Sequence, residues 1–313
     1  SLNEGDSPFY NLNSKIKIYS LFEKNISMKK NFLAAVVLLR KFIKNHKIDV
    51  VISVDSILCM FSVPALAFLK TKHICWEHFN FKVDLGVKYR KYGRILAAKY
   101  CDYVVTLTQR DQELWSNGIK NIKAKVIPIC NPTPFENVNH IPSFEHKTIL
   151  SIGRLTYQKG FDMLIDAWAM VCKVNKDWKL VIVGEGEDKG ALIDKARNLS
   201  IEDRVIFVGE TKNVNFYYKT SSVYCMSSRF EGLPMVLLEA NSYGLPIISF
   251  DCDTGPSEII NKNFLVKCFD LNEYAEKLSK LISNRDFYEN QLSQKSIKKF
   301  RLDEIIVQWE DML

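Results

Sequence analysis

The chain has 313 residues, of which 47% are hydrophobic and 25% charged, so it is long enough for two globular domains and is neither fibrous nor disordered. It has no apolar run of about 18 residues, which excludes a membrane-spanning helix, and its start lacks the pattern of a secretory signal. The net charge of +7 arises in residues 1–140, which hold 21 Lys and Arg but 11 Asp and Glu. We expect an anionic partner for that half, either nucleic acid, a phosphate-bearing acceptor or an anionic lipid surface, unless its lysines only form a solvated face.

The eight cysteines are scattered along the chain, and no two of them are spaced as Cys-x-x-Cys. Most lie within apolar runs, as Cys225 does in the sequence Val-Tyr-Cys-Met. This pattern predicts small buried side chains in a reducing compartment, with neither disulfides nor a metal site. A cytoplasmic location is therefore expected.

The first half alternates segments that have strand and helix patterns. Lys15–Leu21 alternates apolar and polar residues and is predicted to be a half-buried strand, while Met28–His46 has apolar residues at helical spacing. Because no strand with a glycine-rich turn precedes Lys15, the first domain is expected to lack its usual opening strand. The further predicted strands are Asp49–Val54, His73–Trp76, Tyr103–Leu107 and Lys125–Ile129, and the further helices are Ser56–Leu69, Gly86–Lys99 and Gln109–Ser116.

The stretch Cys130–His146 is rich in proline and asparagine and is predicted to link two domains. A second α/β pattern then begins. Both halves are predicted to be doubly wound, with ligands beyond the carboxyl ends of parallel strands. The strands predicted after the linker are Lys147–Ile152, Lys179–Val183, Val205–Val208, Val223–Met226, Pro246–Phe250 and Phe264–Val266, and the helices are Phe161–Val174, Asp188–Leu199, Val214–Thr220, Pro234–Tyr243 and Asn272–Ser283.

The first chemical motif is Gly153-Arg-Leu-Thr-Tyr-Gln-Lys-Gly160, directly after a predicted strand. At the carboxyl end of that strand, Arg154 and Lys159 can converge on one diphosphate. The arginine would bind it as a bidentate fork and the lysine as a compact charge. The alternative is a solvated loop in which Gly160 is only a turn residue.

The second motif places Glu231 before, and Glu239 within, the predicted helix Pro234–Tyr243. The free amide groups at the start of this helix favour a phosphate, and Gly232 allows it to approach closely. Glu239 lies on an otherwise apolar helix face, where a carboxylate is costly unless it accepts hydrogen bonds, and two ribose hydroxyls are suitable donors. The alternative is a structural glutamate bonded to a neighbouring backbone.

Three weaker signals accompany these motifs. Val183-Gly-Glu-Gly186 is predicted to shape the wall of a nucleotide pocket, because its spacing is not the Gly-x-Gly-x-x-Gly of a phosphate cradle. The backbone of Val208 and Gly209 could bind a base edge at the end of the next strand. His78 follows an apolar strand in the first half and could donate a hydrogen bond to a sugar or phosphate oxygen, although a lone histidine is as often structural.

In chain order the motifs read Gly-Arg-Leu-x-x-x-Lys-Gly, Val-Gly-Glu-Gly and Ser-Arg-x-Glu-Gly-Leu-Pro-x-x-x-x-Glu-Ala. Together they resemble the retaining glycosyltransferases of family 4, which have the GT-B fold of two Rossmann-like domains facing each other across a cleft. The resemblance implies an acceptor-side domain at residues 1–140 and a nucleotide-sugar-binding domain at residues 141–296. It also implies a terminal helix at residues 297–313 that crosses back to the first domain.

The resemblance assigns roles to the matching residues. Arg154 and Lys159 would hold the donor diphosphate, Glu231 would touch the donor sugar, Glu239 would hold the ribose, and His78 would lie near the reacting sugar. The implied catalytic residues are Glu231, Arg154, Lys159 and His78. The implied donor-binding residues are Gly153, Arg154, Lys159, Val208, Gly209, Glu231, Gly232, Leu233, Pro234 and Glu239.

The implied reaction is retaining transfer of a hexose or N-acetylhexosamine from a nucleotide sugar, by family frequency UDP-linked, to a lipid-linked or polysaccharide acceptor. Bacterial surface glycans such as lipopolysaccharide or capsule are the expected products. No cofactor or metal is predicted, because cations and helix amides neutralise the leaving diphosphate. The enzyme is expected to be peripheral on the anionic inner face of the plasma membrane and to bind no nucleic acid.

Two alternatives remain open at this point. One is a nucleotide-sugar 2-epimerase of the same fold, and the other is a truncated subunit that binds donor without turnover. A glycosidase is disfavoured because no placed pair of carboxylates is found, and a dehydrogenase because the dinucleotide fingerprint is missing.

Overall fold

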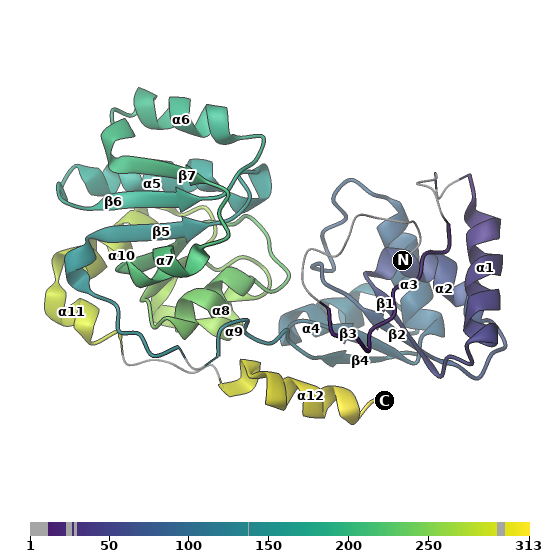
Figure 1. The fold of residues 1–313 in the computed structure, drawn as a ribbon. Coiled ribbons are helices and arrows are strands. Elements are labelled where there is room, and N and C mark those ends of the chain that lie inside the picture. The colour runs from purple at the N-terminus through teal and green to yellow at the C-terminus, as the bar shows by residue number, and fades with distance from the viewer. Residues whose placement is uncertain (1–11, 23–26, 28–29, 137, 293–297) are drawn as a thin grey trace. The chain divides into compact units, whose positions relative to one another are not determined.

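The computed structural model describes residues 12–22, 27, 30–136, 138–292 and 298–313, which form two compact units (Figure 1). Unit 1 comprises Ser1–Thr106 and Gln112–Ile127, and unit 2 comprises Leu107–Asp111 and Pro128–Leu313. Each unit has its own β-sheet with helices packed on it, which confirms the predicted pair of α/β domains.

Unit 1 contains a four-stranded sheet in the order β1-β2-β3-β4, which is also the order of these strands along the chain. The pairs β1–β2 and β2–β3 are parallel. The strands are β1 (Val50–Val54), β2 (Lys72–Trp76), β3 (Tyr103–Thr106) and β4 (Lys125–Pro128), and the helices are α1 (Phe32–Asn45), α2 (Cys59–Leu66), α3 (Tyr89–Tyr100) and α4 (Gln109–Gly118).

The predicted strand at Lys15–Leu21 is wrong. Residues 16–20 have no regular structure, and Ile16 and Ile18 are 55% and 58% exposed. An alternating pattern forms a strand only where a neighbour pairs with its backbone and covers one face. Instead, the ring of Tyr19 packs against Phe42 of α1, with ring centroids 5.1 Å apart. The helix predicted at Met28–His46 is α1, although residues 28 and 29 lie outside the described part of the chain.

Unit 2 contains a six-stranded parallel sheet in the order β10-β9-β8-β5-β6-β7. The strand order reverses between β5 and β8, so this pair is the switch point of a doubly wound sheet. The strands are β5 (Thr148–Ile152), β6 (Lys179–Val183), β7 (Val205–Gly209), β8 (Val223–Met226), β9 (Ile247–Phe250) and β10 (Leu265–Val266). The helices are α5 (Phe161–Cys172), α6 (Lys189–Asn198), α7 (Val214–Lys219), α8 (Met235–Ser242), α9 (Pro256–Ile259), α10 (Leu271–Ser283), α11 (Arg285–Glu289) and α12 (Leu302–Glu310).

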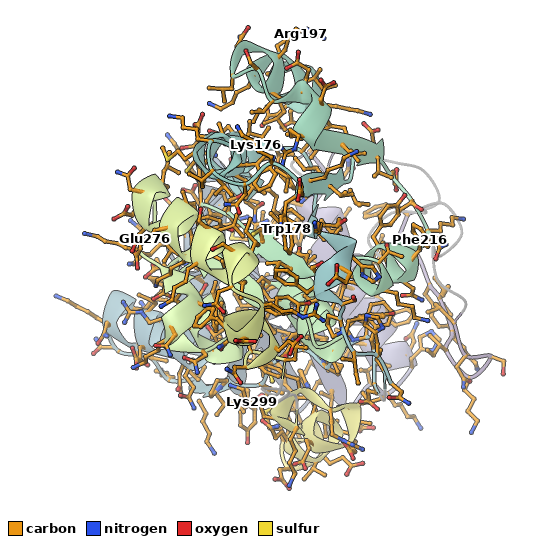
Figure 2. All side chains as sticks on the ribbon, turned by 90° about the vertical axis from the view of Figure 1, so that its left-hand side faces the viewer. Lys176, Trp178, Arg197, Phe216, Glu276 and Lys299 are labelled. Carbon is orange, nitrogen blue, oxygen red and sulfur yellow. The ribbon has the colours of Figure 1, made fainter. Side chains whose placement is uncertain are left out.

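Helices cover both faces of this sheet, so its central strands are buried on both sides. Ile149 and Val223 belong to the apolar cluster on one face, and Leu150 and Tyr224 belong to the cluster on the other. Figure 2 shows Trp178, which is 4% exposed, inside the unit, while the labelled charged side chains extend outward. Burial on both faces explains why the short apolar runs of the sequence become parallel strands.

The C-terminal segment is fastened to the stretch that the sequence predicts as a linker. Thr133 donates a backbone hydrogen bond to the carbonyl of Phe300 at 2.8 Å, and the amide of Leu302 donates to Glu136 Oε1 at 2.7 Å. The crossing of residues 297–313 to the first domain stays a prediction. Within the described ranges, no helix is long and apolar enough to span a bilayer.

Candidate functional site

Two loops follow the strands at the switch point of unit 2. The loop after β5 runs through a 3-10 turn, Tyr157–Lys159, to Gly160, and the loop after β8 leads into α8. Gly160 has a φ of +64°, and a Cβ atom there would collide with the carbonyl of Ser227 in the second loop. A glycine is therefore needed for the two loops to lie against each other.

Arg229 of the second loop holds the first loop in place. Its guanidinium makes a bidentate pair with Asp162, at 2.8 and 2.6 Å, and also donates to the carbonyl of Tyr157 at 2.7 Å. The Arg229 amide bonds to the Gln158 carbonyl at 2.8 Å, and Ser227 Oγ donates to the Lys159 carbonyl at 3.1 Å. Five hydrogen bonds thus fix the loop that carries Lys159.

Lys159 and Glu231 form an ion pair between these loops. Lys159 Nζ lies 2.7 Å from Glu231 Oε1, and the same oxygen accepts a hydrogen bond from Ser228 Oγ at 2.6 Å. Glu231 is 6% exposed, and its carbonyl accepts from Thr254 Oγ1 at 2.5 Å. Its other carboxylate oxygen, Oε2, has no hydrogen-bond partner among the described residues. One side of a fixed carboxylate is thus left for a ligand.

The turn Gly232-Leu233-Pro234 opens α8. Pro234 is the residue before the first helical position, and no side chain caps the amide groups of the first turn. Gly255, with a φ of +101°, lies against this turn, where a Cβ atom would meet Pro234 Cδ. The start of α8 therefore presents amide groups that can bind an anion.

Glu239 lies one helical turn into α8 and is half-buried. Its Oε2 accepts a hydrogen bond from the hydroxyl of Tyr218 in α7 at 2.6 Å, while Oε1 has no partner in the described part of the chain. Burial raises the pKa of Glu239, and the hydrogen bond from Tyr218 opposes that increase. Glu239 therefore resembles Glu231, with one oxygen held by the protein and one open.

Arg154 extends from the end of β5 into solvent. Its side chain is exposed and makes no ion pair or hydrogen bond with any described residue. Gly153 is fixed by a bond from its amide to the carbonyl of Val183 at 3.0 Å. Gly184, with a φ of +141°, packs on the Gly153 carbonyl, where a Cβ atom would collide. The Val-Gly-Glu-Gly turn is thus a support for the loop of Arg154.

Val208 and Gly209 end the edge strand β7. Val208 is half-buried and Gly209 is buried, and the Gly209 carbonyl accepts a hydrogen bond from the amide of Gly184 at 2.9 Å. The ends of β5, β6, β7 and β8 therefore share one edge of the sheet, as the sequence predicted.

His78 belongs to unit 1, where it follows β2. Its ring packs on Trp76 with ring centroids 4.6 Å apart, and its Nε2 has no hydrogen-bond partner among the described residues. Burial lowers the pKa of His78, against an opposing effect of Asp55, and so favours the neutral ring. Such a ring can donate or accept one hydrogen bond with a ligand at Nε2.

Sequence reasoning did not find Asp162, Ser228, Arg229 or Tyr218 as parts of this site. The Asp162–Arg229 and Tyr218–Glu239 pairs join residues 67 and 21 positions apart, which no local motif reveals. The available signals were Ser228 and Arg229, which lie inside the second motif. The bonding of Glu239 to a side chain also differs from the backbone partner considered above.

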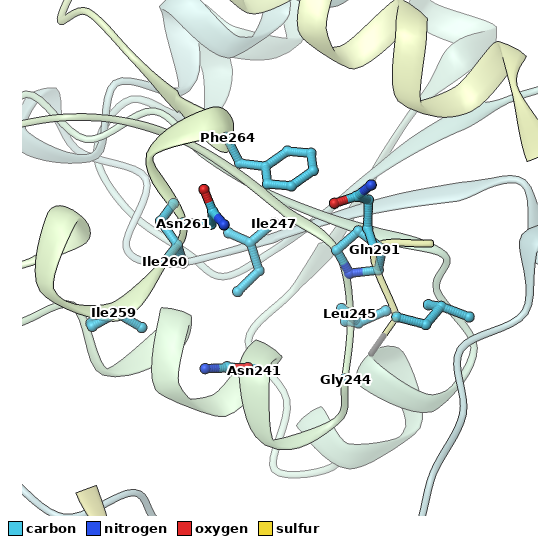
Figure 3. Close-up of a pocket in the computed structure, with 11 residues that line it drawn as sticks. Asn241, Gly244, Leu245, Ile247, Ile259, Ile260, Asn261, Phe264 and Gln291 are labelled. Atoms are coloured by element: carbon cyan, nitrogen blue, oxygen red, sulfur yellow. The ribbon is translucent and has the colours of Figure 1, made fainter. Parts of the chain in front are cut away.

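A cavity of about 60 Å³ lies elsewhere in unit 2 (Figure 3). Leu245 and Ile247, at the start of β9, line it together with Phe264 and Gln291. The start of a strand is the opposite end from the edge where ligands bind in such sheets. Its size and its place therefore separate this cavity from the candidate site.

Solved structures define the class of this fold. The chain aligns with the lipopolysaccharide outer core galactosyltransferase WaaB in its apo form, at a TM-score of 0.72 and 27% identity, over 95% of this chain and 85% of that one. The two parallel-sheet units therefore have the GT-B fold of glycosyltransferases.

The family "Glycosyl transferases group 1" matches residues 136–299, and "Glycosyltransferase Family 4" matches residues 4–130. The chain therefore belongs to the family "Glycosyl transferases group 1". An uncharacterized glycosyltransferase of Haemophilus influenzae is 38% identical over 99% of this chain and 88% of its own length. An α-1,4-N-acetylgalactosaminyltransferase of Campylobacter jejuni, named for an undecaprenyl-diphosphate-linked acceptor, is 30% identical over 96% of this chain and 85% of its own.

Proposed function

We propose that the protein transfers a hexose or an N-acetylhexosamine from a UDP-sugar to a lipid-linked or polysaccharide acceptor, with retention and without a metal ion in the reaction. The observation that carries this proposal is the Lys159–Glu231 pair beside the uncapped start of α8 at the switch point. The galactosyl and N-acetylgalactosaminyl transfers named for the relatives support this class of sugar.

The diphosphate of the donor is assigned to Arg154, Lys159 and the amides of Gly232 and Leu233. As the bond to the sugar breaks, negative charge grows on the departing nucleoside diphosphate. Fixed cations and helix amides aimed at that charge lower the barrier without reorganising. Arg154 is free to turn toward the phosphates, whereas Lys159 is already held by Glu231.

Glu231 and Glu239, which each have one carboxylate oxygen without a protein partner, are assigned to the hydroxyl groups of the donor. Glu231 Oε2 would accept from a hydroxyl of the sugar, and Glu239 Oε1 from the ribose. Val208 and Gly209 would contact the base, and Pro234 fixes the direction of α8. His78 is assigned to the reacting sugar through its open Nε2. The family resemblance implies that the acceptor attacks the sugar from the face that the diphosphate leaves. The leaving phosphate would then help to deprotonate the acceptor.

A cavity of about 420 Å³ in unit 1 supports an acceptor that carries phosphate on an apolar chain. Its charged and apolar lining suits a lipid diphosphate, since cations bind the phosphate and apolar side chains cover the first carbons. Asp84 is the one acidic group among the residues that line it. The lining includes Lys82, Lys91, Lys99, Lys120, Phe81, Ile95 and Ile119.

The same basic surface supports peripheral attachment to an anionic membrane. Liposomes with and without an anionic lipid would test this in a sedimentation assay at low and high salt. We expect binding to the anionic liposomes that is lost at high salt. Binding that does not change with salt contradicts an electrostatic attachment.

The activity is tested with a panel of UDP- and GDP-sugars, with and without a polyprenyl-diphosphate-linked acceptor. We expect nucleoside diphosphate to appear only when donor and acceptor are both present, and the product to keep the α configuration of the donor by NMR. Release without an acceptor, together with a changed sugar, would identify an epimerase. Donor binding without transfer to any acceptor would identify a donor-binding subunit.

Chelation tests the metal-independent part of the proposal. We expect EDTA to leave the initial rate unchanged. If EDTA abolishes the reaction and Mg²⁺ restores it, the reaction uses a divalent ion. Asp251 and Asp253, which follow β9 at the same edge of the sheet, would then be the carboxylates to replace.

A further inference from the structure

Four buried metal-ligating side chains meet in the core of unit 1, away from the residues assigned to the reaction. Cys59 begins α2, His73 and Cys75 lie on β2, and Cys101 ends α3. Their exposed fractions are 0%, 3%, 0% and 5%. Because His73 and Cys75 are two positions apart on one strand, their side chains lie on the same face of the sheet.

The ligand atoms of Cys59, His73 and Cys101 lie close enough together for a tetrahedral site. Cys59 Sγ lies 4.0 Å from Cys101 Sγ, and Cys101 Sγ lies 3.3 Å from His73 Nδ1. The atoms of these three residues all lie within 4.8 Å of one another. A tetrahedral Zn²⁺, with bonds of about 2.3 Å to sulfur and 2.0 Å to nitrogen, separates its ligands by about 3.5–3.8 Å. Small shifts of the side chains would admit the ion.

A chain of hydrogen bonds orients His73 for this role. Ser62 Oγ donates to the Leu58 carbonyl at 3.2 Å and can accept from Ser53 Oγ at 2.8 Å. Ser53 Oγ then accepts from His73 Nε2, which lies 3.0 Å away. This assignment places the proton on Nε2 and directs the lone pair of Nδ1 toward Cys101. Histidine ligands are commonly fixed in this way by a partner behind the metal.

We propose that Cys59, His73 and Cys101 bind one structural Zn²⁺ ion, with Cys75, which lies beside Cys59, as the fourth ligand. The thiol of Cys75 adjoins Cys59, with which it makes a side-chain hydrogen bond. Each cysteine that binds the ion releases its thiol proton, so binding strengthens as pH rises. The ion would join α2, β2 and α3 at three points of the core.

This site departs from the expectation that the cysteines bind no metal. That expectation came from sequence spacing, and here Cys59 and Cys101 are 42 positions apart. Without an ion, weak thiol hydrogen bonds between Cys59 and Cys101 and from Cys101 to His73 would hold the same cluster. A cluster with zinc and a cluster without it differ in metal content, in stability and in the effect of replacing Ser53.

The test begins with the whole chain, produced with added zinc and purified under reducing conditions without a chelator. We expect about one zinc per chain by elemental analysis. Replacing zinc by Co²⁺ should give sulfur-to-cobalt charge-transfer bands and the visible bands of a tetrahedral site. Removing the zinc should lower the melting temperature, and adding zinc back should restore it.

Variants then assign the ligands. C59S and C101S should lose the metal, whereas C172S, which changes a buried cysteine of unit 2, should keep it. S53A leaves all four ligands in place and should weaken zinc affinity by about 10- to 100-fold. Because S53A changes no ligand, it tests the site even if the cysteine variants fail to fold.

The proposal is overturned by a folded, reduced chain that contains no zinc and gives no cobalt bands. A cooperative thermal unfolding transition of the whole chain would show that it is folded. Full metal content in a folded C59S variant, or unchanged zinc affinity in S53A, would also overturn it.

Discussion

Replacing Lys159 by methionine removes the charge assigned to the donor diphosphate and keeps the length of the side chain. In the wild type, Lys159 Nζ lies 2.7 Å from Glu231 Oε1, and the side chains of the two residues are 20% and 7% exposed. The methionine stem can still occupy the space beside Gly153, where an added Cβ atom would lie 3.5 Å from Lys159 Cγ and 3.6 Å from Cδ. The variant therefore tests charge more than packing.

Two effects of this substitution can be separated. Losing a fixed cation near the developing charge should cost about 2–4 kcal/mol in the transition state, which is about 30- to 1,000-fold in kcat/KM. Glu231 also loses its buried partner and keeps only the bond from Ser228. An uncompensated buried charge lowers the free energy of unfolding, by about 1–3 kcal/mol.

The assay measures kcat/KM for the UDP-sugar at a saturating acceptor concentration, together with unfolding in urea. K195M is the matched control, because Lys195 makes an ion pair of 2.8 Å with Asp166 on the surface, where both side chains are about a third exposed. It should change stability by less than about 1 kcal/mol and leave the activity intact. Adding E231Q to K159M should recover part of the stability but not the rate. A K159M enzyme within threefold of the wild-type kcat/KM would refute the role of Lys159.

Four further outcomes are expected. Y218F removes the hydrogen bond that opposes the raised pKa of Glu239, so the donor KM at pH 7 should increase by about fivefold, and an unchanged KM would contradict the assignment. Because the open oxygen of Glu239 binds best when it is ionised, the donor KM of the wild type should increase as pH falls toward the raised pKa, and an E239Q profile should lack this change. The same raised pKa means that the folded chain binds this proton more tightly than the unfolded chain, so the contribution of Glu239 to stability declines as pH rises above 4.5. G160A should lower the melting temperature, since its Cβ would collide with Ser227, whereas G190A, with open space in α6, should be neutral or stabilising; equal melting temperatures would contradict this.

The fold of unit 2 follows from its sequence because its strands are short apolar runs covered on both faces. Residues such as Ile149 and Leu150 are adjacent in sequence yet pack into opposite clusters, so no other arrangement buries both. The strand at Lys15–Leu21 was mispredicted because alternating apolar and polar residues form a strand only beside another strand. The sequence pattern does not show whether such a neighbouring strand exists. A local sequence pattern predicts a strand or helix well only where the burial of its apolar residues alone determines the structure.

The candidate site divides in the same way. Lys159 and Glu231 were predicted because each follows a strand at the same sheet edge, and the structure joins them in an ion pair. The partner of Glu239 could not be predicted, because Tyr218 comes from α7 and reaches it across the sheet edge. Residues that come together only through tertiary packing have no fixed spacing in the sequence, so a sequence motif cannot reveal them.

The two carboxylates suggest how such a site selects its ligand. Glu231 and Glu239 each have one oxygen bound by a protein donor and one open oxygen, so a ligand without a hydroxyl at either position leaves a buried acceptor unpaired. Sites built to bond a hydroxyl discriminate strongly against analogues that lack it. In the proposed site, Arg154 and the α8 amides would contribute affinity for any diphosphate, including the product. We therefore infer that Glu231, which is assigned to the sugar, distinguishes a sugar donor from a free nucleotide more than the cations do, whereas Glu239 would bind the ribose of both.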